Sequence, residues 1–153
     1  MQGLRERRLT GMAAAALLIA AAAAPAAFAA PVERTEAPAE VARHMGELLE
    51  ADKGGVDYAV TWFEGDWSGD GVPDGLAITY HSCRDCGNSV GILSWIYLGG
   101  NGAMAPVREV EIFGGRPRDA DIRPGRISVV TTMPKPGDPR CCPTGEKTWV
   151  LEP

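Results

Sequence analysis

Hydrophobic residues recur at helical spacing in one segment of the chain, residues 39–50. One face of this segment carries four apolar residues, with charged residues at the other positions: Val41, Met45, Leu48 and Leu49. A Gly-Gly pair at positions 54–55 ends the pattern. Because a single short amphipathic helix is not stable alone, this helix is predicted to pack against a sheet.

The remaining hydrophobic pattern is typical of β-strands. Residues 56–64 and 76–82 alternate with period 2, and residues 90–98 are almost continuously apolar, as in a central strand buried on both faces. Further strands are predicted at 107–113, 121–123, 126–132 and 146–151, with burial expected for Val107 and Val110–Phe113. Short turns join most of these strands, so they should pair antiparallel. The sequence therefore predicts an α+β fold: a twisted antiparallel β-sheet of about six or seven short strands, with one N-terminal helix packed on it.

The first 29 residues have the pattern of an export signal. Arg5, Arg7 and Arg8 form a basic start, an alanine-rich apolar run covers residues 12–24, and residues 27–29 read Ala-Phe-Ala before a cleavage point. We expect a signal peptide over 1–29, a flexible lead-in over 30–38 and a single domain over 39–153, in the periplasm or secreted from a bacterial cell. An uncleaved membrane anchor is disfavoured because the run is short and mostly alanine. The Arg7-Arg8 pair leaves the Sec and twin-arginine routes both open.

An Asp- and Gly-rich stretch between the first two long strands is the clearest candidate for chemistry. Its spacing places oxygen ligands at positions 1, 3, 5, 7 (a backbone carbonyl) and 9 of a tight loop, in the order Asp66, Ser68, Asp70, Val72 and Asp74. Calcium accepts six to eight oxygen ligands in irregular geometry, so it is the ion predicted to bind this loop. An EF-hand is not indicated, because Ala77 stands at position 12 and strands flank the loop.

This strand-flanked loop resembles the calcium loops of FG-GAP and VCBS repeats. The resemblance covers about ten residues and implies calcium binding, although those families repeat the unit and this chain has it once. Ser68 stands where Asp or Asn is usual, which implies an affinity in the weak extracellular range of ~10⁻⁴–10⁻³ M. The alternative is an Asp- and Gly-rich turn that holds no ion.

Four cysteines form two close pairs, Cys83 with Cys86 and Cys141 with Cys142. In an exported protein an even number favours two disulfides. Three pairings are open. The one that joins the adjacent Cys141 and Cys142 is disfavoured because that bond is strained. The other two both tie the 83–86 turn to the 141–142 loop, and of these we favour Cys83–Cys142 with Cys86–Cys141. Each cross-link would contribute on the order of 4 kcal/mol by closing a long loop. A redox Cys-x-x-Cys motif and a four-cysteine zinc site are the less favoured alternatives.

The run Asp138-Pro139-Arg140-Cys141-Cys142-Pro143-Thr144, together with the preceding Asp-Gly loop and strands, resembles small exported bacterial proteins of the LppP/LprE lipoprotein type. The resemblance covers residues 65–151 and implies a secreted or envelope β-rich domain of unsettled function. This chain departs from that type by lacking a cysteine for lipid attachment after its apolar run.

The sequence points to binding rather than catalysis. The formal net charge is −5, and the basic leader leaves about −7 on the rest of the chain, which disfavours nucleic acid. His44 and His81, the only histidines, lack a motif for nucleophilic catalysis. We expect a non-enzymatic calcium-binding module for an unknown envelope protein or glycan, with Trp67 as a possible exposed contact. The alternatives are a secreted inhibitor acting through the Pro-rich loop 133–143, and a hydrolase with a calcium-supported site.

Overall fold

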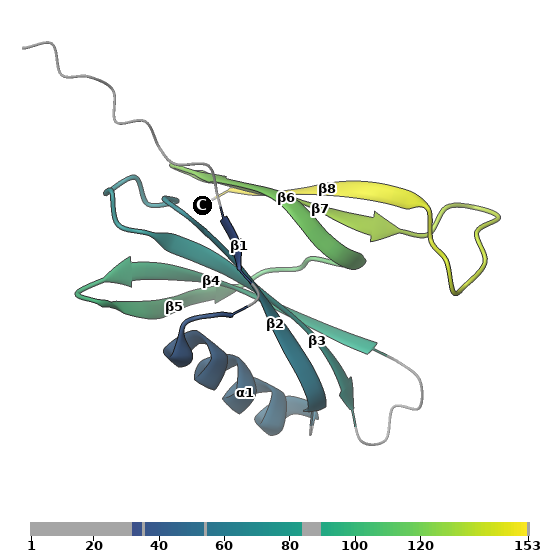
Figure 1. The fold of residues 1–153 in the computed structure, drawn as a ribbon, viewed down its shortest axis with the longest axis horizontal. Helices are drawn as coiled ribbons and strands as arrows, with labels where there is room; N and C mark the ends of the chain where they lie inside the picture. The colour runs from purple at the N-terminus through teal and green to yellow at the C-terminus, as the bar shows by residue number, and fades with distance from the viewer. Residues whose placement is uncertain (1–31, 35, 54, 84–89, 153) are drawn as a thin grey trace, which may run out of the picture.

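The computed structural model describes residues 32–34, 36–53, 55–83 and 90–152, and these form three layers. Sheet A contains five antiparallel strands in the order β1-β2-β3-β4-β5, and sheet B contains three in the order β6-β7-β8. Helix α1 lies on one side of sheet A and sheet B on the other (Figure 1). The elements are β1 Val32–Arg34, α1 Ala39–Lys53, β2 Gly55–Gly65, β3 Asp74–Cys83, β4 Val90–Gly100, β5 Ala103–Glu109, β6 Gly115–Arg123, β7 Arg126–Met133 and β8 Gly145–Leu151.

The predicted α+β class, the helix and the antiparallel pairing are confirmed, but the strands divide between two sheets. The chain leaves sheet A after Glu109, so the strand predicted at 107–113 is wrong beyond that residue. Val110 and Ile112 are buried as expected in this crossing segment, whereas Val107 and Phe113 are 42% and 51% exposed. Gly114, with φ of 96°, turns the chain into sheet B.

The lead-in predicted to be flexible contains a strand. Val32–Arg34 pairs antiparallel with the end of β2, where Val32 lies opposite Glu64. The predicted signal peptide lies outside the described residues. No helix in the described part of the chain is long and apolar enough to cross a membrane.

Sheet A is covered on both faces, which accounts for the almost continuous apolar run in β4. Between the two sheets lies the larger cluster, whose members include Phe63, Leu76, Ile78, Ile96 and Ile127. Between sheet A and α1 lies the smaller cluster, made by Val41, Met45, Trp62, Ala77 and Tyr97. The successive residues Leu76 and Ala77 therefore point to opposite faces and are both buried, as the period of a strand requires.

Glycine permits a close approach of the two sheets at the end of β2. A Cβ on Gly65 would lie 2.7 Å from the carbonyl oxygen of Ile122 in β6 and 2.6 Å from its Cβ. Only a residue without a side chain fits there. This contact fixes the end of β2, and with it the start of the Asp-rich loop, against the β6–β7 hairpin.

Candidate functional site

The Asp-rich loop joins β2 to β3 and is closed by its own first carboxylate. Asp66 accepts hydrogen bonds from the backbone N–H of Gly69 at 2.7 Å and of Gly71 at 3.1 Å. Both glycines have positive φ, 81° and 83°, a conformation that side-chain-bearing residues rarely adopt. The sequence therefore folds locally into a tight loop because Asp66 and the two glycines stand at these positions.

Asp74 at the other end of the loop is fully buried and fixes the loop to sheet A. Its Oδ2 accepts from the N–H of Ser68 at 2.7 Å, and its Oδ1 accepts from the N–H of Gly99 in β4 at 2.9 Å. These two bonds join the two ends of the loop and connect it to the β4–β5 hairpin. Asp74 is thus a structural anchor as well as a predicted ligand.

Some of the predicted ligand side chains lie near each other, but their carboxylates do not converge on one point. Ser68 Oγ lies 3.5 Å from Asp66 Oδ1, while Asp70 turns forward to accept from the N–H of Val72 at 2.8 Å. Among the described residues, no three His, Cys, Asp or Glu side chains form a group that could hold a metal ion. Each carboxylate has about four lone-pair sites, so Asp66 and Asp70 keep acceptor capacity beyond their backbone bonds. Calcium binding at Asp66, Ser68, Asp70, Val72 and Asp74 remains a prediction.

Trp67 does not point outward as an exposed contact. Its side chain is 9% exposed and belongs to the cluster between the sheets. Its carbonyl accepts from the N–H of Gly125 in the β6–β7 turn at 2.8 Å, and the Arg108 guanidinium lies 6.0 Å from its ring centre. The expectation of an exposed Trp67 is therefore corrected: the ring fits under the loop because the apolar space between the sheets continues there. One edge of Trp67 still borders a surface pocket of about 260 Å³ beside Ser68.

His44 has a structural partner across the helix–sheet interface. A hydrogen bond of 2.8 Å joins His44 Nδ1 to Tyr97 Oη in β4, and the His44 ring packs edge-on against Trp95. Burial raises the pKa of the Tyr97 hydroxyl well above its usual range. His81 is 2% exposed and packs so close to Gly91 that a Cβ there would meet its ring. Neither environment resembles that of an accessible catalytic base.

The Pro-rich loop between β7 and β8 is organised by Asp138, a role that sequence reasoning missed. This carboxylate accepts from the N–H of Lys135 at 2.8 Å and from both the N–H and the hydroxyl of Thr144, at 2.7 and 2.9 Å. The N–H groups of Lys135 and Thr144 lower the pKa of Asp138 below its usual value. The only available signal was an Asp within a Pro-Gly-Asp-Pro run, a composition typical of a turn.

Cys141 and Cys142 lie in this loop as exposed free thiols. Cys83 ends β3 in sheet A, and Cys86 lies outside the described residues. The disulfides Cys83–Cys142 and Cys86–Cys141 therefore stay a prediction about the oxidised protein.

No family model matches the chain, and no curated protein or solved structure matches it either. The resemblances to FG-GAP and VCBS loops and to the LppP/LprE type remain predictions from short motifs. The function of the chain is therefore inferred from its own residues and their geometry.

Proposed function

We propose that this chain is an exported, non-enzymatic binding or structural module that takes one calcium ion in the loop Asp66–Asp74. The observation that carries the proposal is a loop closed in advance by its own side chains. Asp66 and Asp74 accept hydrogen bonds from three N–H groups of the loop and from one of β4, so little chain entropy remains to be lost when an ion binds.

Three exposed or half-exposed groups would supply the ion's first ligands: Asp66, Ser68 and the free Oδ2 of Asp70. The carbonyl of Val72 and the remaining lone pairs of Asp74 would complete the shell, with water at the open positions. The backbone N–H groups compete for the same carboxylate oxygens. We therefore expect an affinity of ~10⁻⁴–10⁻³ M, as in extracellular calcium modules.

Calcium titration of the purified protein by calorimetry tests this proposal. Asp70→Asn is the sharpest variant, because the amide oxygen can still accept from the N–H of Val72 while the charge at position 5 is lost. Asp119→Asn is the matched control, since it removes another exposed carboxylate, on β6 and away from the loop.

The expected result is saturable binding of one calcium ion, retained in Asp119→Asn and weakened at least tenfold in Asp70→Asn. Absence of binding up to about 10 mM calcium, above the range for weak extracellular sites, would refute the proposal. Equal binding by Asp70→Asn would also refute it, because the ion would then lie elsewhere.

The Pro-rich loop supports a second candidate function, a secreted inhibitor acting through residues 133–143. The loop projects from the end of sheet B between β7 and β8 (Figure 1), and its residues between Pro134 and Thr144 are exposed except for the half-buried Asp138. The Asp138 bonds fix its shape, and a rigid projecting loop binds a cleft at low entropic cost.

A panel of exported proteases separates this candidate from the first. If the protein is an inhibitor, the variant Arg140→Ala, which changes an exposed residue of the loop, should no longer inhibit the protease. The variant Asp70→Asn should still inhibit it. The calcium module predicts the opposite dependence for partner binding. If the unmodified protein inhibits no protease in the panel, the inhibitor candidate fails.

A further inference from the structure

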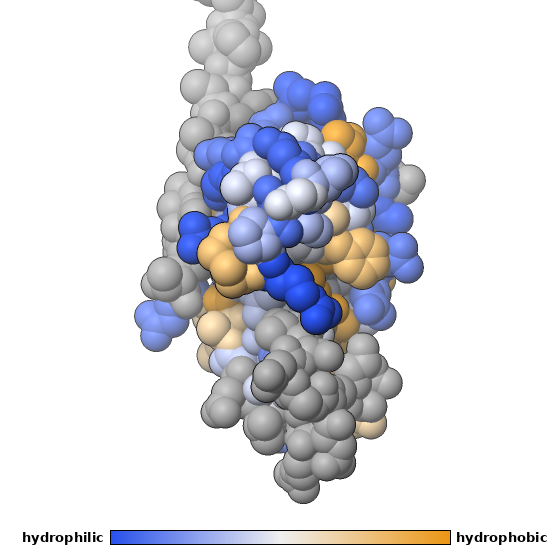
Figure 2. Space-filling view, turned by 90° about the vertical axis from the view of Figure 1, so that its right-hand side faces the viewer, coloured by the Kyte–Doolittle hydropathy of each residue, from blue (hydrophilic) through white to orange (hydrophobic). Residues whose placement is uncertain are grey.

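A surface pocket of about 340 Å³ lies between the start of β6 and the β7–β8 loop. Its lining brings together two thiols, two threonines and one arginine: Cys141, Cys142, Thr132, Thr144 and Arg116. Figure 2 looks onto this end of the molecule and shows mainly hydrophilic side chains, with a few hydrophobic ones among them. The pocket is separate from the Asp-rich loop and has no part in the proposed calcium site.

The two thiols are adjacent in the chain, exposed and free, and both line the pocket. The loop keeps its shape through the three Asp138 bonds and a turn in which the Cys142 N–H donates to Pro139 O at 3.0 Å. Neither sulfur is therefore required to hold the loop together, so both are free to bind a ligand.

The lining chemistry selects a soft ion of low coordination number. Thiolate sulfur favours Cu(I) and other soft ions over calcium or magnesium. In the described part of the chain, these two cysteines are not joined by a third His, Cys, Asp or Glu into a metal-binding group. A structural zinc site needs four such ligands, whereas Cu(I) is satisfied by two sulfurs.

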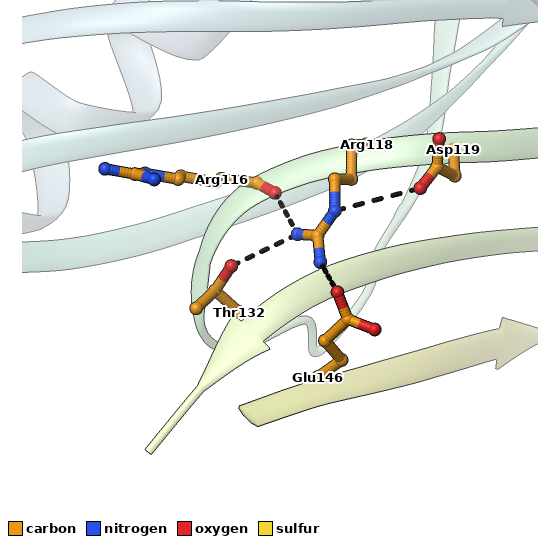
Figure 3. A network of polar contacts seen from close by, with 5 residues as sticks. All are labelled: Arg116, Arg118, Asp119, Thr132 and Glu146. Atoms are coloured by element: carbon orange, nitrogen blue, oxygen red, sulfur yellow. Dashed lines mark hydrogen bonds and ion pairs between the residues drawn. The ribbon is translucent and has the colours of Figure 1, made fainter. Parts of the chain in front are cut away.

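Arg116 supplies the positive charge that such a complex needs. It has φ of 50° at a bulge of β6, where the register with β7 shifts between Gly115 and Arg118. Arg118 Nη1 donates to the Arg116 carbonyl at 3.1 Å, and Thr132 and Glu146 hold the Arg118 guanidinium in place (Figure 3). The Arg116 side chain points away from this network and has no hydrogen bond or ion pair among the described residues.

We propose that, in the reduced protein, where the predicted disulfides are absent, this pocket binds one Cu(I) ion through the Sγ atoms of Cys141 and Cys142. Each thiol releases its proton to solvent as a sulfur–copper bond forms, and no electron is transferred. Two thiolates and one Cu(I) carry a net charge of −1, which the Arg116 guanidinium in the same lining offsets.

Competition for Cu(I) against the coloured chelator bicinchoninate, with reduced protein under anaerobic conditions, tests the proposal. The protein should remove one Cu(I) per chain from the chelator. Cys141→Ser and Cys142→Ser should each reduce this affinity at least a hundredfold, while the double variant Cys83→Ser/Cys86→Ser should retain it. Both loop cysteines are exposed, so the serine variants should keep the native circular dichroism spectrum.

A matched pair of arginine variants isolates the charge effect. Arg116→Gln should weaken Cu(I) binding roughly tenfold, whereas Arg126→Gln, which removes an exposed arginine from the far end of β7, should leave it unchanged. The proposal would be overturned if Cys141→Ser bound Cu(I) as tightly as the unmodified protein. It would also be overturned if only the double variant Cys83→Ser/Cys86→Ser lost Cu(I) binding. X-ray absorption spectra of the loaded protein that show no sulfur bound to copper would overturn it as well.

Discussion

Replacing Asp74 by alanine should remove the anchor that fixes the Asp-rich loop to sheet A. The Asp74 side chain is fully buried, and its two oxygens accept hydrogen bonds from the N–H groups of Ser68 and Gly99. Alanine offers neither acceptor. The variant leaves two backbone donors without their partner and also opens a small void beneath the loop.

The magnitude depends on the kind of bond that is lost. A hydrogen bond to a charged group contributes about 1.5–3 kcal/mol. The two bonds are partly buried, so water can replace part of each, and the lower end applies. We expect Asp74→Ala to lower the free energy of unfolding by about 3–4 kcal/mol. Asp74→Asn keeps one acceptor oxygen and should lose about half as much.

Urea denaturation in the presence of EDTA measures this loss without a contribution from calcium. Asp70→Ala is the control, because its exposed carboxylate makes one local bond to Val72 and should contribute no more than about 1 kcal/mol. If Asp74→Ala and Asp70→Ala destabilise the protein equally, or if the Asp74→Ala loss is below about 1 kcal/mol, the anchoring role of Asp74 is refuted.

Three further changes test other parts of the molecule. Gly75→Ala would place a Cβ 2.2 Å from the ring of the buried Trp62 and should lower the free energy of unfolding by about 3 kcal/mol in urea titrations. Tyr97→Phe removes the bond to His44 and should lower it by about 1 kcal/mol, with a similar coupling energy in a double-mutant cycle with His44→Ala. The pKa of Asp138 is lowered by its bonds to Lys135 and Thr144, so it stabilises the loop above pH 3.8, the ordinary value. That contribution is lost as the pH falls through the lower folded pKa, and NMR should show faster motion of the loop amides there.

Each of these changes has a control and an opposing outcome. Gly100→Ala places its Cβ in open space, so it should be harmless where Gly75→Ala is not. A coupling energy near zero between Tyr97 and His44 would mean that their bond adds nothing to stability. Asp138→Ala, which removes every acceptor, should make the loop mobile at neutral pH, and an unchanged NMR spectrum would contradict its structural role.

Local elements were predictable because each depends on residues close together in the chain. The helix at residues 39–50 is indicated by spacing alone, and β2, β3 and β4 match their predicted ranges within a few residues. The division into two sheets was not predictable in this way. It depends on a crossing segment, residues 110–114, whose buried Val110 and Ile112 give the same alternating pattern as a strand.

The candidate site was predictable in its residues but not in their roles. Spacing alone located Asp66, Ser68 and Asp70, yet it gave no sign that Asp74 is buried against Gly99, which lies 25 positions further along the chain. The pocket at Cys141 could not be foreseen either, since it requires Arg116 at a bulge of a different strand. Contacts of this kind join segments that are distant in the chain but lie close together within one sheet, sheet A for Asp74 and Gly99 and sheet B for Arg116 and the β7–β8 loop.

The two proposed sites differ in how they connect to the rest of the fold. The Asp-rich loop contacts both sheets: Asp74 bonds to Gly99 in sheet A, and the Trp67 carbonyl bonds to Gly125 at the turn of sheet B. An ion that binds only the closed loop therefore stabilises the junction of the sheets and, by linkage, the whole domain. The thiols of the β7–β8 loop lie outside both hydrophobic clusters, in a loop that Asp138 already closes. Copper bound there should slow amide exchange within the β7–β8 loop and leave the stability of the junction between the sheets unchanged. Calcium should raise the thermal unfolding temperature of the domain, so the two measurements together distinguish which site is occupied.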